Sequence, residues 1–134
     1  MPSIITIEGI GVKYAAMLKA AGIITVEQLL DAGATPKGRK ALSAKIGISE
    51  KLILEWVNHA DLFRIKGVGE EYADLLEAAG VDTVVELAQR NAANLYQALV
   101  KSNEAKKLVR QLPTEKMVTA WIEQAISLPR VVSY

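Results

Sequence analysis

The 134-residue sequence contains no cysteine and one histidine, and each scarcity excludes a class of chemistry. Without cysteine, the chain has no disulfide, no thiol nucleophile and no cysteine-ligated zinc or iron–sulfur site. With His59 alone, a histidine-rich metal site cannot form, and a histidine-dependent triad has a single candidate base. The carboxylates show no metal-ligand spacing, and no nucleotide-binding motif is present. We therefore expect no enzyme, no metal and no cofactor.

Long apolar runs and an excess of one charge are also missing. No stretch approaches the roughly 18 apolar residues that a membrane-spanning helix needs, and the amino terminus lacks a secretory signal. The 16 lysines and arginines against 15 aspartates and glutamates give a net charge of +1. The chain as a whole is therefore not attracted to nucleic acid or membrane, and any such affinity must come from local patches. We expect a folded cytoplasmic protein that does not contact membranes.

An internal repeat is the main organising feature of the chain. A shift of 58 residues aligns the segment 7–29 with the segment 65–87. A shift of 65 residues aligns 49–60 with 114–125, so the second copy carries seven extra residues between its two blocks. Both tryptophans fall in register, as do the glycines that precede the first helix of each copy. We predict two repeats and a short C-terminal tail, at 1–62, 63–128 and 129–134.

Hydrophobic periodicity within each repeat predicts short helices. Apolar residues of 14–21 recur at helical spacing, and 72–79 copy the pattern. A glycine follows each of these segments as a left-handed helix end, and capping boxes at 25–28 and 83–86 begin the next helices. Because no run reads convincingly as a strand, the predicted fold class is all-α, built from two tandem repeats of short helices.

A pair of glycines precedes the first helix of each repeat. The pattern apolar-x-Gly-apolar-Gly occurs at 7–11 and 65–69, which we name the first and second glycine turns. Glycine lets the backbone enter a helix tightly, and amides at a helix N-terminus suit a phosphate oxygen. A compact joint between helices with no ligand explains the same pattern. The candidate nucleic-acid-binding residues here are Gly9, Ile10, Gly11, Lys13, Gly67, Val68 and Gly69.

This spacing resembles the helix-hairpin-helix motif of DNA-binding proteins that do not read sequence. The longer string from Gly9 through Thr25 to Gly47-Ile48-Ser49-Glu50 is similar to the N-terminal domain of archaeal and eukaryotic recombinases. Over nearly its whole length, the chain resembles a bacterial family of tandem helix-hairpin-helix proteins of unknown function. The resemblance implies paired helix-hairpin-helix motifs, and relatives with known roles use the hairpins to grip a nucleic-acid backbone.

Charged side chains close to these turns favour different functions. The acidic residues of 70–77 follow the second turn, where they either repel phosphate or stabilise the start of a helix. Basic residues gather in matching parts of the two repeats, where they contact phosphates or form a solvated face. They are Lys37, Arg39, Lys40 and Lys45 in the first repeat, and Lys101, Lys106, Lys107 and Arg110 in the second. Trp56 and Trp121 lie on apolar stripes, which favours core positions over base stacking.

Two functions fit this sequence. The first is a non-catalytic module that holds the backbone phosphates of DNA or RNA, without sequence specificity, through turn amides and lysines. The alternative is a protein–protein interaction or scaffold module that has kept the fold but lost nucleic-acid binding. The paired basic clusters favour the first function and the acidic helix favours the second, while homo-oligomers are compatible with both.

Overall fold

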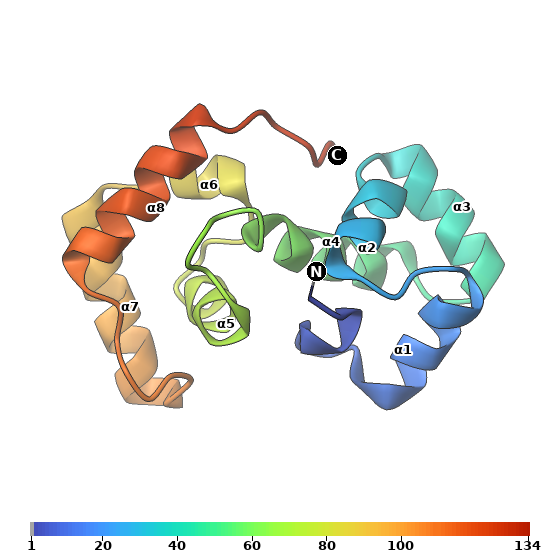
Figure 1. Cartoon of the computed structure of the whole chain (residues 1–134), viewed down its shortest axis with the longest axis horizontal. Helices are drawn as coiled ribbons and strands as arrows, with labels where there is room; N and C mark the ends of the chain where they lie inside the picture. Colours follow the sequence, from blue (N-terminus) through green and yellow to red (C-terminus); the bar gives the residue numbers. More distant parts are fainter. Residues whose placement is uncertain (1) are drawn as a thin grey trace. The chain divides into compact units, whose positions relative to one another are not determined.

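The structure is a computed structural model that describes residues 2–134, so Met1, the first residue of the predicted repeat 1–62, lies outside the described residues. Within 2–134 the chain forms eight α-helices and one short 3-10 helix (Figure 1). An isolated bridge between Ser3 and Thr25 is the one β-type pairing in that range, and no strand forms there. The predicted all-α class is therefore confirmed.

The helices divide into two compact units. Unit 1 takes the chain up to Asp61 together with Val131–Tyr134, and unit 2 takes Leu62–Arg130. Val131–Tyr134, which the sequence places in the tail 129–134, thus belong to unit 1. Unit 1 contains η1 (Ile4–Thr6), α1 (Gly11–Ala20), α2 (Val26–Gly33), α3 (Pro36–Ile46) and all of α4 (Glu50–Leu62) except its last residue. Unit 2 contains α5 (Glu70–Ala78), α6 (Val84–Ala88), α7 (Ala92–Lys106) and α8 (Glu115–Ser127).

Short polar side chains begin most of these helices. At α2, Thr25 Oγ1 accepts from the Gln28 amide at 3.1 Å and Gln28 Oε1 accepts from the Thr25 amide at 3.3 Å, which completes the predicted capping box. At α6, Thr83 accepts from the Glu86 amide, but the Glu86 carboxylate accepts from the Asp82 amide. The second box is thus displaced by one residue. Caps of this kind contribute about 1 kcal/mol each to helix stability.

The helices that follow the glycine turns end in the same way. Gly22 and Gly80 adopt φ of 85° and 92°, as the sequence predicts for left-handed helix ends. The Ile23 amide donates to the Leu18 carbonyl oxygen at 2.9 Å, and the equivalent bond closes α5 at the same length. These bonds satisfy carbonyl groups that the last helical turn would otherwise leave without a partner.

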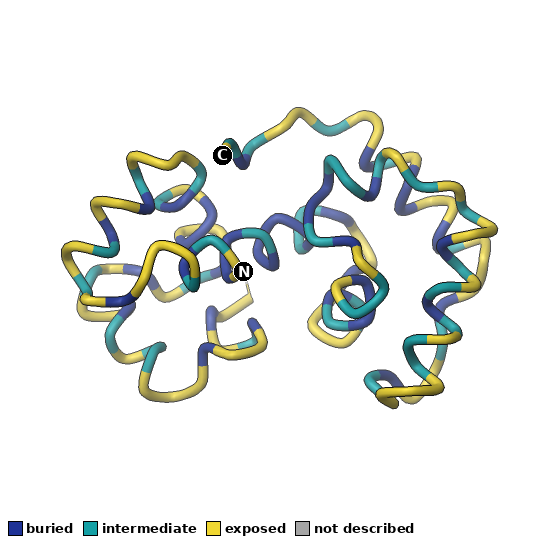
Figure 2. The backbone as a smooth tube through the Cα atoms, turned by 180° about the vertical axis from the view of Figure 1, so that it is seen from behind, coloured by how far each residue is buried: buried dark blue, intermediate teal, exposed yellow. Residues whose placement is uncertain are grey.

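Each unit buries its own apolar core, seen as the dark segments along the helices in Figure 2. Trp56 in unit 1 and Trp121 in unit 2 are each 2% exposed, which confirms their predicted core positions. Trp121 packs in unit 2 with residues that include Leu76, Leu87 and Leu99, all fully buried. Fully burying a side chain of this size contributes about 1.5–3 kcal/mol.

The extra residues of unit 2 lie in α7 and in the connection that follows it. Helix α7 has 15 residues, whereas α3, its counterpart in unit 1, has 11. Gly47 ends α3 in a left-handed conformation, and one residue separates it from Ser49, which accepts from the Leu52 amide. Lys107 ends α7 in the same conformation, but six residues, 108–113, separate it from the capping residue of α8. The longer connection therefore falls among the basic residues of the second repeat.

Candidate nucleic-acid interface

The two glycine turns share the conformation of their first glycine but diverge at the second, where Gly11 has φ of 58° and Gly69 has φ of −100°. In the first turn the Ile10 amide donates to the Ile7 carbonyl oxygen at 3.2 Å, and in the second the Val68 amide donates to the Ile65 carbonyl oxygen at 3.1 Å. The first glycine of each turn has φ of 90° or 92°, a region that residues with a Cβ rarely adopt. The repeated local structure therefore includes the first glycine of each turn but not the second.

A tyrosine–tryptophan pair lies behind each turn. The ring centroids of Tyr14 and Trp56 are 5.2 Å apart at 56°, and those of Tyr72 and Trp121 are 5.3 Å apart at 52°. A Cβ on the first glycine would lie 3.7 Å from the indole Nε1 in the first turn and 3.2 Å in the second. Since tilted aromatic pairs contribute about 0.5–1.5 kcal/mol beyond their burial, each pair supports a rigid turn.

Neither helix after a turn has a side-chain cap. Ile10 stands at the N-cap of α1 and Gly69 at the N-cap of α5, and neither residue provides a side-chain hydrogen bond. The first amides of a helix have no intrahelical acceptor, and they lie at the positive end of the helix dipole. Both helix starts can therefore donate to water or to an anion.

The predicted turn residues divide into exposed and buried members. Ile10 and Val68 are 1% and 5% exposed, so their side chains belong to the core and they offer only backbone groups. The other predicted turn residues are exposed, namely Gly9, Gly11, Lys13, Gly67 and Gly69. Each turn thus presents backbone amides, and the first turn adds the ammonium group of Lys13.

The charges around the two helix starts differ. In the first glycine turn Lys13 stands against the exposed Glu8. In the second, Lys66 stands against Glu70 and Glu71. The first turn of α1 contains no acidic residue, whereas α5 begins with Glu70 and Glu71, which are both exposed. Carboxylates at a helix start stabilise the helix and repel a phosphate from the same amides. The first glycine turn is therefore the better anion site of the two.

Arg39 requires a correction to the predicted basic cluster of unit 1. Its side chain is 5% exposed; Nη1 donates to the Gly33 carbonyl oxygen at 2.8 Å and Nη2 donates to the Ser133 carbonyl oxygen at 2.7 Å. It lies three residues before the buried Leu42 and shares that face of α3. The guanidinium group therefore donates to backbone carbonyls and does not offer these donors to a phosphate.

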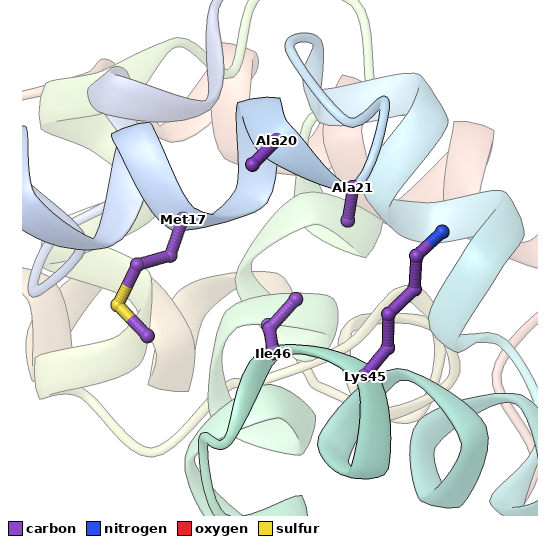
Figure 3. A pocket seen from close by; sticks show the side chains of 5 residues that line it. All are labelled: Met17, Ala20, Ala21, Lys45 and Ile46. Atoms are coloured by element: carbon purple, nitrogen blue, oxygen red, sulfur yellow. The ribbon is translucent and has the colours of Figure 1, made fainter.

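The remaining lysines of that cluster are exposed but do not gather around the first glycine turn. Lys37 and Lys40 belong to the N-terminal half of α3. In Figure 1, α3 begins at the top of unit 1, whereas α1 begins at the bottom. Lys45 lines a groove of about 270 Å³ whose other lining residues are Met17, Ala20, Ala21 and Ile46 (Figure 3). This groove lies at the C-terminal end of α1, about 15 Å from its start.

The basic cluster of unit 2 lies at the end of α7 and in the connection that follows. Asn103 holds this connection, because its side chain accepts from the Val109 amide at 2.9 Å and donates to the Val109 carbonyl oxygen at 3.2 Å. The Tyr72 hydroxyl group donates to the Gln111 carbonyl oxygen at 3.1 Å, which ties the connection to the first turns of α5. All four predicted members are exposed: Lys101, Lys106, Lys107 and Arg110. The structure thus links this cluster to the helix that carries the acidic residues.

Sequence reasoning missed the two groups that fix these segments, Asn103 and the C-terminal residues. The Ser133 amide donates to the Ala34 carbonyl oxygen at 2.8 Å, Val132 is 3% exposed, and the Tyr134 hydroxyl group bonds Asn58 Oδ1 at 3.1 Å. An asparagine three residues before a helix end and a Val-Val pair are weak sequence signals. The connection after α7 and the C-terminal segment are both held by hydrogen bonds to backbone groups. Such bonds do not depend on residue type, so the sequence contains no sign of them.

Residues 2–134, which the structure describes, offer neither a cluster of metal ligands nor a membrane-spanning helix. Within that range no group of three or more histidine, aspartate or glutamate side chains is placed to hold a metal ion. Over the same residues, each helix is too short or too polar to span a bilayer.

In a comparison with known families, residues 8–128 match the model of a domain of unknown function, DUF4332. The chain belongs to the DUF4332 family. The match extends over the paired helices of both units and over both basic clusters, so DUF4332 membership applies to nearly the whole chain. No solved structure matches the chain.

Proposed function

We propose that this DUF4332 chain is a tandem helix-hairpin-helix protein that binds the phosphate backbone of nucleic acid, above all duplex DNA, without catalysis. The uncapped start of α1 in the first glycine turn is the observation that carries the proposal. Its amides lie at the positive end of a helix, Lys13 adds a full charge, and no acid stands in the first helical turn. A phosphate oxygen is the ligand that such a helix start suits best.

Binding of this kind is weak, sensitive to salt and indifferent to sequence. One glycine turn and one lysine meet one or two phosphates, so the logarithm of affinity should fall with the logarithm of salt concentration with a slope of about −1 to −2. Apart from the exposed carboxylate of Glu8, which the phosphates on either side of a base would repel, the side chains of the turn are buried, as for Ile10, or absent, as for Gly9. Base edges therefore have no partner in the turn, and phosphate contacts alone carry no sequence information.

A titration of labelled duplex DNA tests this proposal. We expect Lys13→Gln to weaken binding and to reduce the salt slope by about one. Lys116→Gln is the matched control, because Lys116 is an exposed lysine of α8 and its substitution removes the same charge. No binding at about 50 mM salt, or equal effects of the two substitutions, would reject the proposal.

A second pair of variants tests the amides themselves. Gly11 has φ of 58°, and a Cβ there meets no atom within 4 Å. Asparagine and aspartate both tolerate this backbone region and differ by one charge. We expect Gly11→Asp to abolish binding and Gly11→Asn to retain most of it. Equal affinities of the two variants would show that the turn does not hold the phosphate.

A protein-binding function is the second candidate, and exposed apolar side chains on η1, on α1 and after the end of α1 favour it. Val12 is 78% exposed, Ile24 50% and Ile5 48%. Apolar side chains grouped on a surface are typical of protein–protein contacts. A nucleic-acid backbone would leave these three side chains without a suitable partner.

A further inference from the structure

The exposed face of α1 combines apolar and basic residues. Val12, Ala16 and Lys19 are exposed and recur at the i, i+4 and i+7 spacing of one helical face, with Lys13 beside them. Helix α1 contains no acidic residue. The face is therefore positively charged and partly apolar.

The same surface continues beyond α1. Ile24 is half exposed and joins a groove of about 150 Å³ between η1 and α1. The groove is lined by Ser3, Ile4, Ala15, Ala16, Lys19 and Ile24. We define the α1 surface as Val12, Lys13, Ala16, Lys19 and Ile24. Its groove can accept side chains from a partner, and its lysines favour a partner that is acidic.

Unit 2 carries acids at all five equivalent positions. The residues 58 positions after those of the α1 surface are all acidic. We define them as the α5 surface: Glu70, Glu71, Asp74, Glu77 and Asp82. The buried positions between them keep their apolar character, as in Leu18 and Leu76 or Ile23 and Val81. Since apolar residues occupy these buried positions in both units, the core does not require the change from apolar and basic residues to acids. The two surfaces therefore differ in the partner that they attract.

We infer that the α1 surface of one molecule docks on the α5 surface of a second copy of this chain. The α1 surface carries two ammonium groups and no acid. The α5 surface carries five acidic residues, of which Glu70, Glu71 and Glu77 are exposed and Asp74 and Asp82 are half-buried. Each molecule thus carries both a basic α1 surface and an acidic α5 surface that complements it. Opposite charges across a small interface favour association and determine the orientation of the partners. This contact uses the exposed sides of the helices rather than the turn amides, so it goes beyond the proposed nucleic-acid binding.

Two different surfaces make this contact head-to-tail. Such an interface builds open chains of molecules or a closed ring, unlike a symmetric dimer in which one surface meets itself. A contact formed by one helix from each partner lies at the small, transient end of protein interfaces. It should weaken in strong salt, because the screening length falls from about 10 Å at 0.1 M to about 3 Å at 1 M.

Sedimentation of the whole chain over a range of concentrations tests this inference. At low salt we expect the mass to rise above the 14.5 kDa of one chain with increasing concentration, and to return to one chain at about 1 M salt. The doubly substituted chain Val12→Glu/Lys19→Glu has two acidic surfaces, and Glu71→Lys/Glu77→Lys makes the α5 surface more basic. Each variant alone should stay at the mass of one chain, and an equal mixture of the two should associate.

The control carries the same changes on another helix. Ile126→Glu/Lys116→Glu substitutes one exposed apolar residue and one exposed lysine on α8, and it should associate like the unmodified chain. All substituted side chains are exposed, and circular dichroism verifies that each variant is folded. The inference is overturned if the unmodified chain keeps the mass of one chain at every concentration. It is equally overturned if the control dissociates like the α1 variant, or if the mixture fails to associate. Lys13 and the glycines are unchanged throughout, so nucleic-acid binding can fail or succeed separately.

Discussion

The guanidinium group of Arg39 donates a 2.7 Å hydrogen bond to the carbonyl oxygen of Ser133, a residue 94 positions further along the chain. The same group donates to the Gly33 carbonyl oxygen at 2.8 Å, and the Ser133 amide donates to the Ala34 carbonyl oxygen at 2.8 Å. These bonds hold the segment Val131–Tyr134 on unit 1. Arg39 is therefore a structural residue within a stretch of surface lysines.

Substitution of Arg39 should destabilise unit 1. We expect Arg39→Gln to lower the free energy of unfolding by about 1.5–3 kcal/mol, because one buried and one partly buried carbonyl group lose a charged donor. Urea denaturation measures this loss, and hydrogen exchange at the Ser133 amide should accelerate. Lys40→Gln, at the exposed neighbouring position, should change stability by less than about 0.5 kcal/mol. Equal effects of the two substitutions would contradict the role of Arg39.

The sequence alone could not reveal the role of Arg39. Its neighbours Lys37, Lys40 and Lys45 form a basic run, and a run of this kind predicts a solvated face. Helical spacing does place residue 39 on the side of Leu42, which was the available sign of burial. Its two acceptors are backbone carbonyls, and the one on Ser133 comes close only after the whole chain has folded. Contacts of that kind leave no pattern among neighbouring residues.

The positive φ of the glycine turns leads to a prediction about Gly67 and Gly9. Alanine at either position is strained by its backbone conformation, at a cost of about 1–2 kcal/mol. Gly67→Ala should cost more, because its Cβ would lie 3.2 Å from Trp121 Nε1, compared with 3.7 Å for the equivalent distance in unit 1. Thermal unfolding, with tryptophan fluorescence as the signal, gives both values. A smaller loss for Gly67→Ala than for Gly9→Ala would contradict the contact with the indole ring.

Lys107 occupies a conformation that suits glycine. It has φ of 51° at the end of α7, where α3 in unit 1 has Gly47. We expect Lys107→Gly to stabilise unit 2 by about 0.5–1 kcal/mol, since glycine adopts left-handed conformations without steric cost. Lys106→Gly, one residue earlier and still helical, should instead destabilise it by about 1 kcal/mol. Chemical denaturation of both variants tests whether their stabilities change in opposite directions. A loss of stability in Lys107→Gly would refute the prediction.

The acidic start of α5 should suppress anion binding at the second glycine turn. We expect Glu70→Gln/Glu71→Gln to increase the affinity for duplex DNA at low salt, because two carboxylates no longer face the phosphate. Glu115→Gln/Glu123→Gln removes the same charge from exposed positions on α8 and is the matched control. Fluorescence anisotropy measures both affinities. An equal increase in the two variants would show that net charge, and not the turn, determines binding.

Local features of the candidate site could be predicted from the sequence, and long-range ones could not. The glycine turns, the helix ends at Gly22 and Gly80 and the capping box at Thr25 depend on residues within one or two helical turns of each other. The separation of Lys37 and Lys45 from the first glycine turn depends instead on how α3 packs in unit 1. Sequence spacing contains no information on that packing, so the basic residues looked like one cluster.

Amide chemical shifts provide the most direct test of phosphate binding at the first glycine turn. Duplex DNA is added at low salt to the labelled protein while the backbone amide signals are followed. The proposal predicts that the signals of Gly9, Ile10, Gly11 and Lys13 move and return at high salt, whereas those of Gly67, Val68 and Gly69 stay in place. Unchanged signals at the first glycine turn, in a protein whose other signals respond to the duplex, would contradict it.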